Sequence, residues 1–310
     1  MKPNIFFHSE IDSAEGWRVA LATQFEEFHF STLESLEHPE AVDIALIWTV
    51  PDGGLRRFRS LRAILSLGAG IDQLDLNEIP LRMPLARLVD ASLARTMTDY
   101  AKAAVYRYHR RFDVFEQYSR DGKWQFMPAT LTRDTVVGVL GLGEIGREIA
   151  LSLHHEGFHM LGWSRTPKRL DGVQSYTGRD GLHRMVGECH ILINVLPLTS
   201  ETRHTLSNEI FSRCRAGMQL INMGRGQHLV ESDLLEALQS GKIGGATLDV
   251  AIVEPLPREH PFWSHPRILI TPHVAGTSIP MLAVRNIAGN IRRAIKGDAL
   301  LNEVDVLRGY

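Results

Sequence analysis

The sequence predicts an α/β protein built from two doubly wound parallel-sheet domains, and three observations lead to this prediction. At 310 residues the chain is longer than most single small domains. Short apolar runs alternate with amphipathic stretches twice along the chain, which is the pattern of parallel strands joined by crossover helices. The second alternation opens on a glycine-rich run at residues 138–146, where a strand is expected to turn into a helix.

The first hundred residues contain short apolar runs separated by turn residues. Gly53 and Gly54 mark one turn, and the Gly-Ala-Gly sequence at residues 68–70 marks another. The strands predicted from these runs span residues 4–8, 42–48, 62–67 and 85–89.

A long amphipathic stretch follows, and we interpret residues 92–120 as one continuous helix. Residues 121–124 break the pattern, and Pro128 prevents the helix from resuming. The apolar side of the predicted helix carries Met97, Tyr100, Ala101, Ala104, Val105 and Tyr108.

The second alternation contains enough strands for a complete dinucleotide-binding sheet. Its predicted strands span residues 136–140, 159–164, 190–196, 219–223, 246–250 and 268–271, and its helices include 144–155, 209–214 and 231–239. A last helix at residues 280–297 is expected to pack back on the first domain. The resulting prediction is a Rossmann cofactor domain (residues 99–280) inserted into a smaller flavodoxin-like substrate domain (residues 1–98 and 281–310).

Composition narrows the classes of function. The chain is 44% hydrophobic and 23% charged, as expected of a globular protein with a substantial core. A net charge of −2 gives no reason to expect nucleic acid or a membrane surface as a partner. The apolar stretch at the N-terminus is too short for a signal-peptide core, and no run of about 18 apolar residues occurs, so a cytoplasmic location is the default expectation.

Cysteine and histidine give no metal or redox signal. Cys189 and Cys214 are too few for a disulfide framework, and we expect both to be small buried residues. The pairs at residues 154–155, 189–190 and 259–260 lack the spacing of a zinc or iron site, so no metal is predicted.

The glycine signature predicts a dinucleotide site. Gly141 would permit a tight turn, Gly143 would let the backbone approach a pyrophosphate, and Gly146 would allow close helix–sheet packing. Amide groups near Glu144 and Ile145 would then face the pyrophosphate at the helix N-terminus. An ordinary strand–helix turn is the alternative interpretation.

The end of the next strand indicates which nicotinamide cofactor is bound. An NAD site has an acidic residue there to bind the ribose 2′-hydroxyl, and this chain has none. Ser164, Arg165, Thr166 and Lys168 suit a 2′-phosphate instead, since an arginine can pair with it through two hydrogen bonds. NADP(H) is therefore favoured and NAD(H) remains possible; a solvated basic loop is the alternative.

Three charged residues follow strand-like runs and suggest chemistry on an oxo-acid. Arg225 offers a planar fork to a carboxylate and an adjoining carbonyl, and His273 can exchange a proton near neutral pH. Glu254 could reach the imidazole and favour its charged form. The plain alternatives are a surface arginine, a structural histidine and a surface glutamate bracketed by prolines. Asp249 could face the nicotinamide or simply end a strand.

Together these motifs resemble the D-isomer-specific 2-hydroxyacid dehydrogenase family. The matching stretches, in the family's order, are the glycine signature with Ala150, then 222–226, 230–250, 254–257 and 271–276. A closer likeness, to a reductase subgroup of the family, extends over nearly the whole chain. It rests on residues 48, 67–72, 110–113, 124–125, 163–166, 172–175 and 308–310.

The resemblance implies an activity and a role for each charged residue. The activity is NADPH-dependent reduction of small 2-keto acids, glyoxylate to glycolate and hydroxypyruvate to D-glycerate. Arg225 would hold the substrate carboxylate and polarise the keto oxygen, and His273 would donate the proton with Glu254 as its partner. The complete cofactor set predicted is Gly141, Gly143, Glu144, Ile145, Gly146, Ser164, Arg165, Thr166, Lys168, Leu196, Pro197, Met223, Asp249 and Gly276.

The resemblance also implies contacts from outside the cofactor domain. Backbone amides of Ala69 and Gly70 would bind the substrate carboxylate, and domain closure would assemble the site. Trp48 and the crowded loop at 67–71 favour a small substrate. Family members are commonly homodimers, and Trp124 is expected to cross the interface toward the partner's pocket.

Two other functions fit the same motifs. One is a D-2-hydroxyacid dehydrogenase acting on a bulkier 2-keto acid. The other is a dinucleotide-sensing protein that resembles the family's transcriptional corepressors, against which the presence of all three charged residues argues. Binding of a protein partner without useful turnover would favour that second function.

Overall fold

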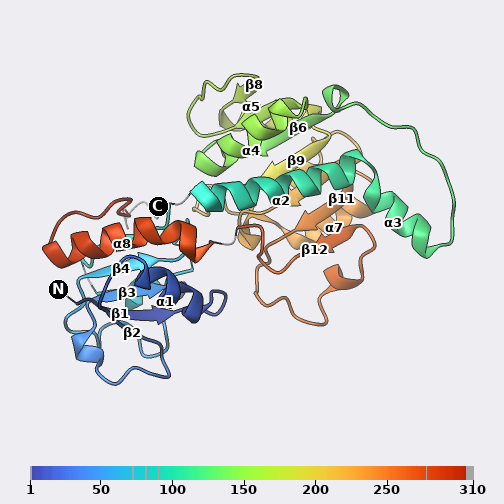
Figure 1. The fold of residues 1–310 in the computed structure, drawn as a ribbon. Helices are drawn as coiled ribbons and strands as arrows, with labels where there is room; N and C mark the ends of the chain where they lie inside the picture. Colours follow the sequence, from blue (N-terminus) through green and yellow to red (C-terminus); the bar gives the residue numbers. More distant parts are fainter. Residues whose placement is uncertain (1, 72, 81, 90, 277, 305–310) are drawn as a thin grey trace. The chain divides into compact units, whose positions relative to one another are not determined.

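A computed structural model describes residues 2–71, 73–80, 82–89, 91–276 and 278–304 of the chain. Asp72 and residues 308–310, which contribute to the sequence resemblance, lie outside the described part. The chain divides into two compact units, one formed by residues 1–93 and 278–310 and the other by residues 94–277 (Figure 1). Each unit has its own sheet.

The first unit contains a five-stranded sheet in which every pairing is parallel. Its strands are β1 (Asn4–His8), β2 (His29–Ser31), β3 (Ile44–Ile47), β4 (Ala63–Ser66) and β5 (Leu85–Ala86). The spatial order β2-β1-β3-β4-β5 is that of flavodoxin-like folds. β2 was not predicted, because a three-residue edge strand with no buried residue carries little apolar signal.

Two helices cover one face of this sheet. α1 (Ala14–Ala22) and α8 (Pro280–Lys296) share an apolar core with alternate residues of the strands. α8 starts with a proline in its first turn, where no hydrogen bond is lost, and ends at Gly297 in the left-handed region with φ +78°. The opposite face is covered by loop residues and by the short 3₁₀ helix η2 (Leu76–Glu78). Another 3₁₀ helix, η1 (Pro39–Ala41), precedes β3 and buries none of its residues.

The second unit contains a seven-stranded parallel sheet. Its strands are β6 (Val136–Leu140), β7 (His159–Trp163), β8 (Val173–Tyr176), β9 (Ile191–Asn194), β10 (Met218–Asn222), β11 (Ile243–Leu248) and β12 (Ile268–Ile270). Their order, β8-β7-β6-β9-β10-β11-β12, is the 3-2-1-4-5-6 arrangement of dinucleotide-binding folds with one strand added. The sequence predicted six of these strands and missed β8, a four-residue edge strand.

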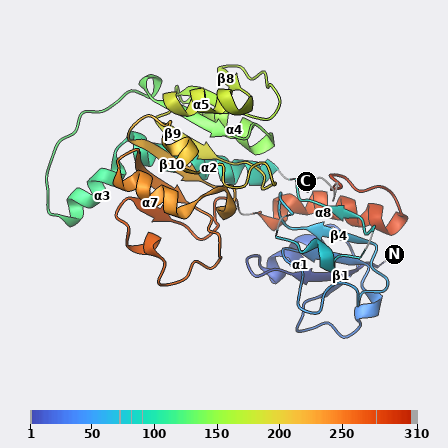
Figure 2. The ribbon, with the colours of Figure 1, turned by 180° about the vertical axis from the view of Figure 1, so that it is seen from behind.

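Helices cover both faces of this sheet (Figures 1 and 2). α2 (Ala91–His109) and α4 (Glu144–His155) lie on one face, where the Tyr108 hydroxyl is 2.8 Å from the Thr247 hydroxyl of β11. α5 (Gly178–Glu188), α6 (Asn208–Phe211) and α7 (Glu231–Gln239) share the core of the other face. The remaining 3₁₀ helices are η3 (Thr132–Asp134), η4 (Gly226–His228) and η5 (Pro261–Ser264).

The prediction of one helix over residues 92–120 was wrong. The chain breaks at Arg111, which has φ +61°, and α3 (Phe112–Arg120) starts immediately after it. α3 buries none of its residues, so the apolar stripe of α2 has no continuation there. An ion pair of 2.6 Å between Arg107 and Glu116 links the two helices. No proline or glycine marks this break, so the sequence pattern did not reveal it.

The predicted fold class is confirmed, with two parallel-sheet α/β domains and the dinucleotide-type domain placed between two segments of the smaller one. Among the described residues, no helix is long and apolar enough to cross a membrane.

Candidate active site

The candidate cofactor site lies where the strand order of the second unit reverses. Ligands of open α/β sheets bind at the carboxyl ends of the strands at such a switch point, here between β6 and β9. The loops after these two strands are in close contact, since a Cβ on Gly141 would lie 3.1 Å from the Val195 carbonyl oxygen. The predicted cofactor residues Leu196 and Pro197 belong to the second loop.

The three signature glycines have three different surroundings. Gly141 has φ +100°, a conformation that side chains rarely allow. A Cβ on Gly146 would lie only 1.7 Å from the Gly141 carbonyl oxygen, so this position requires glycine for the helix to pack. A Cβ on Gly143 would meet no described atom within 4 Å, which leaves the backbone open to a ligand. α4 begins at Glu144 without a side-chain cap from the described residues, so its first amides suit a pyrophosphate.

The basic loop after β7 is exposed on the same edge of the sheet. Ser164 is buried, and its hydroxyl donates to the Thr166 carbonyl at 2.8 Å, which fixes the turn. Arg165, Thr166 and Lys168 are exposed. The first position after the strand therefore holds a neutral hydroxyl where an NAD site normally places a carboxylate.

Arg225 lies in the loop after β10, between two glycines that make room for their neighbours. A Cβ on Gly226 would lie 2.0 Å from the Ala251 carbonyl carbon, so the Arg225 loop packs directly on the backbone that follows β11. The Arg225 side chain is half-buried and donates to the Gly224 carbonyl at 2.9 Å.

Glu254 and His273 form a close pair in this unit. Glu254 Oε2 lies 2.7 Å from His273 Nδ1, and Glu254 Oε1 accepts the Ala251 amide at 2.9 Å. Burial acts to raise the pKa of Glu254, but the hydrogen bonds from His273 and Ala251, with the charges of His273 and Arg225, lower it overall. The carboxylate is therefore ionised at neutral pH and can stabilise a charged imidazole.

The His273 loop is held in an unusual backbone conformation by Asp249. His273 has φ +54°, and non-glycine residues adopt this region mainly where surrounding contacts enforce it. The buried Asp249 carboxylate accepts the amides of Val274 and Ala275, each at 2.9 Å, and the Thr271 hydroxyl at 2.6 Å. Burial raises the pKa of Asp249, against the opposing effect of these hydrogen bonds and of the His273 charge.

Tyr100 extends this network into α2. Its hydroxyl lies 2.6 Å from the Thr271 hydroxyl, and burial raises its pKa to about 12. The sequence placed Tyr100 on an apolar helix face and gave no sign of this contact. Nor did it show that Asp249, whose two oxygens both bind the loop at residues 271–275, holds the backbone of the proton-donor candidate.

The first unit brings together the candidate substrate contacts Trp48, Ala69 and Gly70. Trp48 directly follows β3, and the loop carrying Ala69 and Gly70 follows β4, so both lie at the carboxyl edge of that sheet. A Cβ on Gly68 would lie 2.8 Å from the Trp48 ring and 3.1 Å from the Gly70 carbonyl oxygen. The loop is therefore closely packed against the Trp48 ring.

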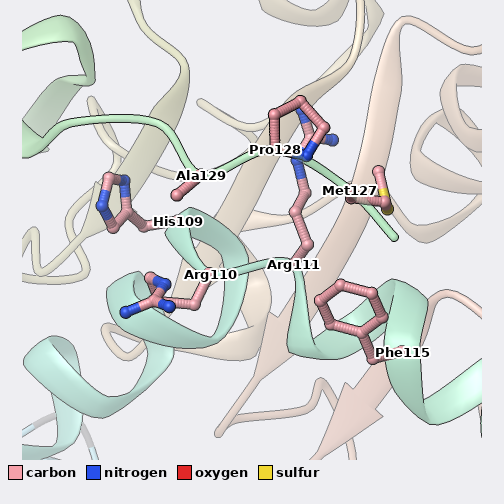
Figure 3. Close-up of a pocket in the computed structure, with 7 residues that line it drawn as sticks. All are labelled: His109, Arg110, Arg111, Phe115, Met127, Pro128 and Ala129. Atoms are coloured by element: carbon pink, nitrogen blue, oxygen red, sulfur yellow. The ribbon is translucent and has the colours of Figure 1, made fainter. Parts of the chain in front are cut away.

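Trp124 is a strongly exposed residue of the second unit. It lies in the segment after α3 and is fully exposed, at 103% of the reference area, and Phe126 beside it is 85% exposed. Farther along this segment, Met127, Pro128 and Ala129 pass over the end of α2 and cover a small pocket (Figure 3). None of the predicted site residues lines that pocket.

Metal binding finds no support in the side-chain geometry. Within the described ranges, no three histidine, cysteine or acidic side chains are placed to hold a metal ion. Both cysteines are buried, and burial raises their pKa values, that of Cys214 to about 12.

A dinucleotide-type sheet with an arginine and a Glu–His pair in the loops beyond its strands defines a nicotinamide-dependent dehydrogenase of the two-domain α/β class. Residues 103–275 match the model of the D-isomer specific 2-hydroxyacid dehydrogenase NAD binding domain. The chain belongs to the D-isomer-specific 2-hydroxyacid dehydrogenase family, so the resemblance inferred from the sequence is confirmed.

Relatives and solved structures agree with this assignment. The glyoxylate/hydroxypyruvate reductase A of Serratia proteamaculans is 38% identical over 99% of this chain and 100% of its own. A D-isomer specific 2-hydroxyacid dehydrogenase from Xanthobacter autotrophicus, solved with NADPH and MES, has a TM-score of 0.92 at 36% identity over all of both chains. The NADPH-dependent glyoxylate/hydroxypyruvate reductase of Sinorhizobium meliloti, solved with NADP and sulfate, has a TM-score of 0.91 at 32% identity, again over all of both chains.

Proposed function

We propose that the chain reduces small 2-keto acids with NADPH, forming glycolate from glyoxylate and D-glycerate from hydroxypyruvate. The observation that carries this proposal is the 2.7 Å pairing of Glu254 with His273, close enough to Arg225 for the arginine charge to act on the carboxylate. These groups provide a proton donor, its orienting base and a binding group for an oxo-acid. The full-length reductase relatives support the choice of substrate class.

In this proposal Arg225 binds and polarises the substrate. Its guanidinium pairs with the carboxylate through two parallel hydrogen bonds and draws electron density toward the keto oxygen. The family resemblance adds the backbone amides of Ala69 and Gly70 as proposed donors to the carboxylate. Trp48, whose ring packs against the same loop of the first unit, is the residue proposed to favour small acids.

His273 supplies the proton. When bound, NADPH supplies the hydride that the keto carbon receives. The Nδ1 of His273 faces the ionised Glu254, so its Nε2 is the nitrogen assigned to the keto oxygen. Glu254 stabilises the imidazolium before the transfer and fixes the plane of the ring. A proton passes from Nε2 to the oxygen, which leaves a neutral imidazole and a 2-hydroxy acid.

The residues around the switch point fit an NADP(H) molecule. Gly143 leaves open space at the start of α4 for the pyrophosphate. Arg165, with Thr166 and Lys168, would bind the 2′-phosphate, and Ser164, whose hydroxyl donates to the Thr166 carbonyl, would fix the turn that carries them. The absence of an acid after β7 removes the usual partner of NAD. The remaining cofactor contacts proposed are Gly141, Glu144, Ile145, Gly146, Leu196, Pro197, Met223, Asp249 and Gly276.

We also propose a homodimer in which Trp124 contacts the partner's substrate pocket. Full exposure of a tryptophan beside an exposed phenylalanine is unfavourable unless another surface covers them. Light scattering after size-exclusion chromatography should give twice the chain mass. Trp124→Ala should then raise the KM for the keto acid, while a monomer with unchanged KM would contradict this part of the proposal.

The function is tested by steady-state NADPH oxidation with glyoxylate, hydroxypyruvate, pyruvate and phenylpyruvate, repeated with NADH. Preference for the first two acids and for NADPH is the expected result. Preference for phenylpyruvate would replace the substrate and keep the mechanism. Tight NADPH binding without turnover of any acid would overturn the proposal in favour of a dinucleotide-sensing protein.

A further inference from the structure

Three fully buried polar side chains lie beneath the Arg225 loop. Asn194 ends β9, Asn222 ends β10 beside it in register, and His228 ends η4; each has 0% exposure. Burying amide and imidazole groups is costly unless their hydrogen bonds are satisfied. These three residues satisfy one another and the surrounding backbone.

The hydrogen bonds determine the tautomer of His228. The Arg225 peptide N–H donates to His228 Nδ1 at 3.1 Å, so Nδ1 must be an acceptor without a hydrogen. The side-chain amide of Asn194 approaches the same nitrogen at 3.0 Å. His228 Nε2 therefore carries the hydrogen and donates to the Pro197 carbonyl at 3.2 Å. A charged imidazole would place a second donor against the Arg225 amide, so the ring is neutral.

The same network holds both peptide groups of Arg225. Its carbonyl accepts the Asn222 side-chain amide at 3.1 Å and the His228 backbone amide at 3.2 Å. The network packs against the bare face of Gly224, where a Cβ would lie 2.9 Å from Asn194 Nδ2 and 3.0 Å from His228 Nδ1. Glycine before Arg225 thus provides the space that the buried groups require.

We propose that His228, as the neutral tautomer protonated on Nε2, is a positioning residue that ties the substrate-binding Arg225 to the cofactor-side segment at Pro197. This inference rests on the proposed function for the roles of these two segments. His228 is fully buried and is not among the residues assigned to either ligand. Its Nδ1 fixes the position of the Arg225 backbone amide, and its Nε2 fixes the position of the Pro197 carbonyl.

Two substitutions separate the two bonds. In asparagine, the side-chain amide atoms are separated from Cα by the same number of bonds as Nδ1 of histidine. In glutamine, they are separated from Cα by the same number of bonds as Nε2 of histidine. His228→Gln should keep the Pro197 bond and lose the Arg225 bond, which raises the keto-acid KM about 5- to 10-fold and leaves the NADPH Kd unchanged. His228→Asn should do the reverse, raising the NADPH Kd by a similar factor and leaving the keto-acid KM unchanged.

The opposite pattern of the two variants is the decisive readout. His228→Gln removes the acceptor of both the Arg225 and the Asn194 amides and should unfold at a lower urea concentration than His228→Asn, but a loss of stability alone would not move the two constants in opposite directions. Parallel changes in both constants, or lower stability with unchanged constants, would overturn the proposal. If neither variant folds, Gly224→Ala disturbs the network without removing a polar group and should raise the keto-acid KM; an unchanged KM would again overturn it.

Failure of the proposed function gives a different result. If the wild-type protein binds NADPH but turns over no keto acid, calorimetric binding of oxamate to the NADPH complex replaces the KM. Weaker oxamate binding in His228→Gln alone would support the positioning role, and equal weakening in both variants would overturn it.

Discussion

The two loops that carry the charged residues of the site are held in different ways. Beneath Arg225 lie neutral groups, the amides of Asn194 and Asn222 and the imidazole of His228. Beneath His273 lies a single buried carboxylate, Asp249, which accepts two backbone amides and a hydroxyl. Both arrangements satisfy hydrogen bonds of the loop backbone. They differ in charge, since one is neutral and the other contains a carboxylate.

A neutral network suits an arginine that must bind an anion. A carboxylate beneath Arg225 would compete with the substrate for the guanidinium, whereas neutral amides fix the backbone and leave the positive charge for the ligand. The situation differs at His273, whose charge acts to lower the pKa of both Asp249 and Glu254, so carboxylates are suited to the loop that carries the proton donor. The support of each loop therefore matches the charge that its functional residue requires.

The largest effect is expected from removing the proton donor. His273→Gln should lower kcat about 10²- to 10⁴-fold, the usual contribution of general acid catalysis. The Kd for NADPH, measured by fluorescence titration, should stay within about twofold of wild type because the cofactor residues are unchanged. His155→Gln, an exposed histidine on α4, is the matched control. Turnover near the wild-type rate in His273→Gln would remove the acid role.

Breaking the charged support should have the next largest effect. Asp249→Asn places an amide nitrogen where the Ala275 or Val274 N–H donates, and a buried unsatisfied donor costs about 1–3 kcal/mol. If this free-energy cost is met by the loss of the ordered position of His273, kcat falls about 5- to 150-fold. Thr271→Val, which removes one donor and keeps both amides, should cost less. Equal kcat in Asp249→Asn and wild type would show that the carboxylate is not needed to support the loop.

A change outside both loops sharpens the comparison by altering only cofactor choice. Arg165→Ala should raise the KM for NADPH about 10- to 100-fold relative to that for NADH, since a hydrogen bond to a charged group contributes about 1.5–3 kcal/mol. The kcat at saturating NADPH should stay the same because neither loop is touched. Arg169→Ala, at another exposed position of the same loop, is the control. Parallel losses with both cofactors would remove the 2′-phosphate assignment.

The functional residues themselves were predictable because each follows an apolar strand. Parallel strands bring their carboxyl ends to one edge, so Arg225 after β10 and His273 after β12 could be placed in one region from the sequence. The supports of the loops were not predictable. Asn194 meets His228 across 34 positions of chain only because β9 and β10 pair in one particular register. The one available signal was an asparagine closing an otherwise apolar strand.

Local patterns failed where the deciding contacts were distant or the signal was short. The long helix breaks at Arg111, where α2 ends and the exposed α3 begins, and neither this change of burial nor the Arg107–Glu116 pair is visible in the local hydrophobic period. Asp249 could be placed at a strand end, but its choice of partners required the fold of the loop that follows β12. Edge strands such as β8 were missed because they bury few residues.

The smallest effect is expected at Glu254, which is partly exposed and supports His273 from the side. Glu254→Gln should lower kcat at neutral pH about fivefold or less, as for other partly exposed ion pairs.

The pKa of Glu254 in the folded protein is below the ordinary value of 4.5. The stability that the carboxylate contributes is therefore complete above that value and is lost as the pH falls through the folded pKa. Urea unfolding should therefore separate wild type from Glu254→Gln at pH 7 and bring them together in acid. A difference that persists once the pH has fallen well below the folded pKa would mean that the carboxylate is not held in its ionised form.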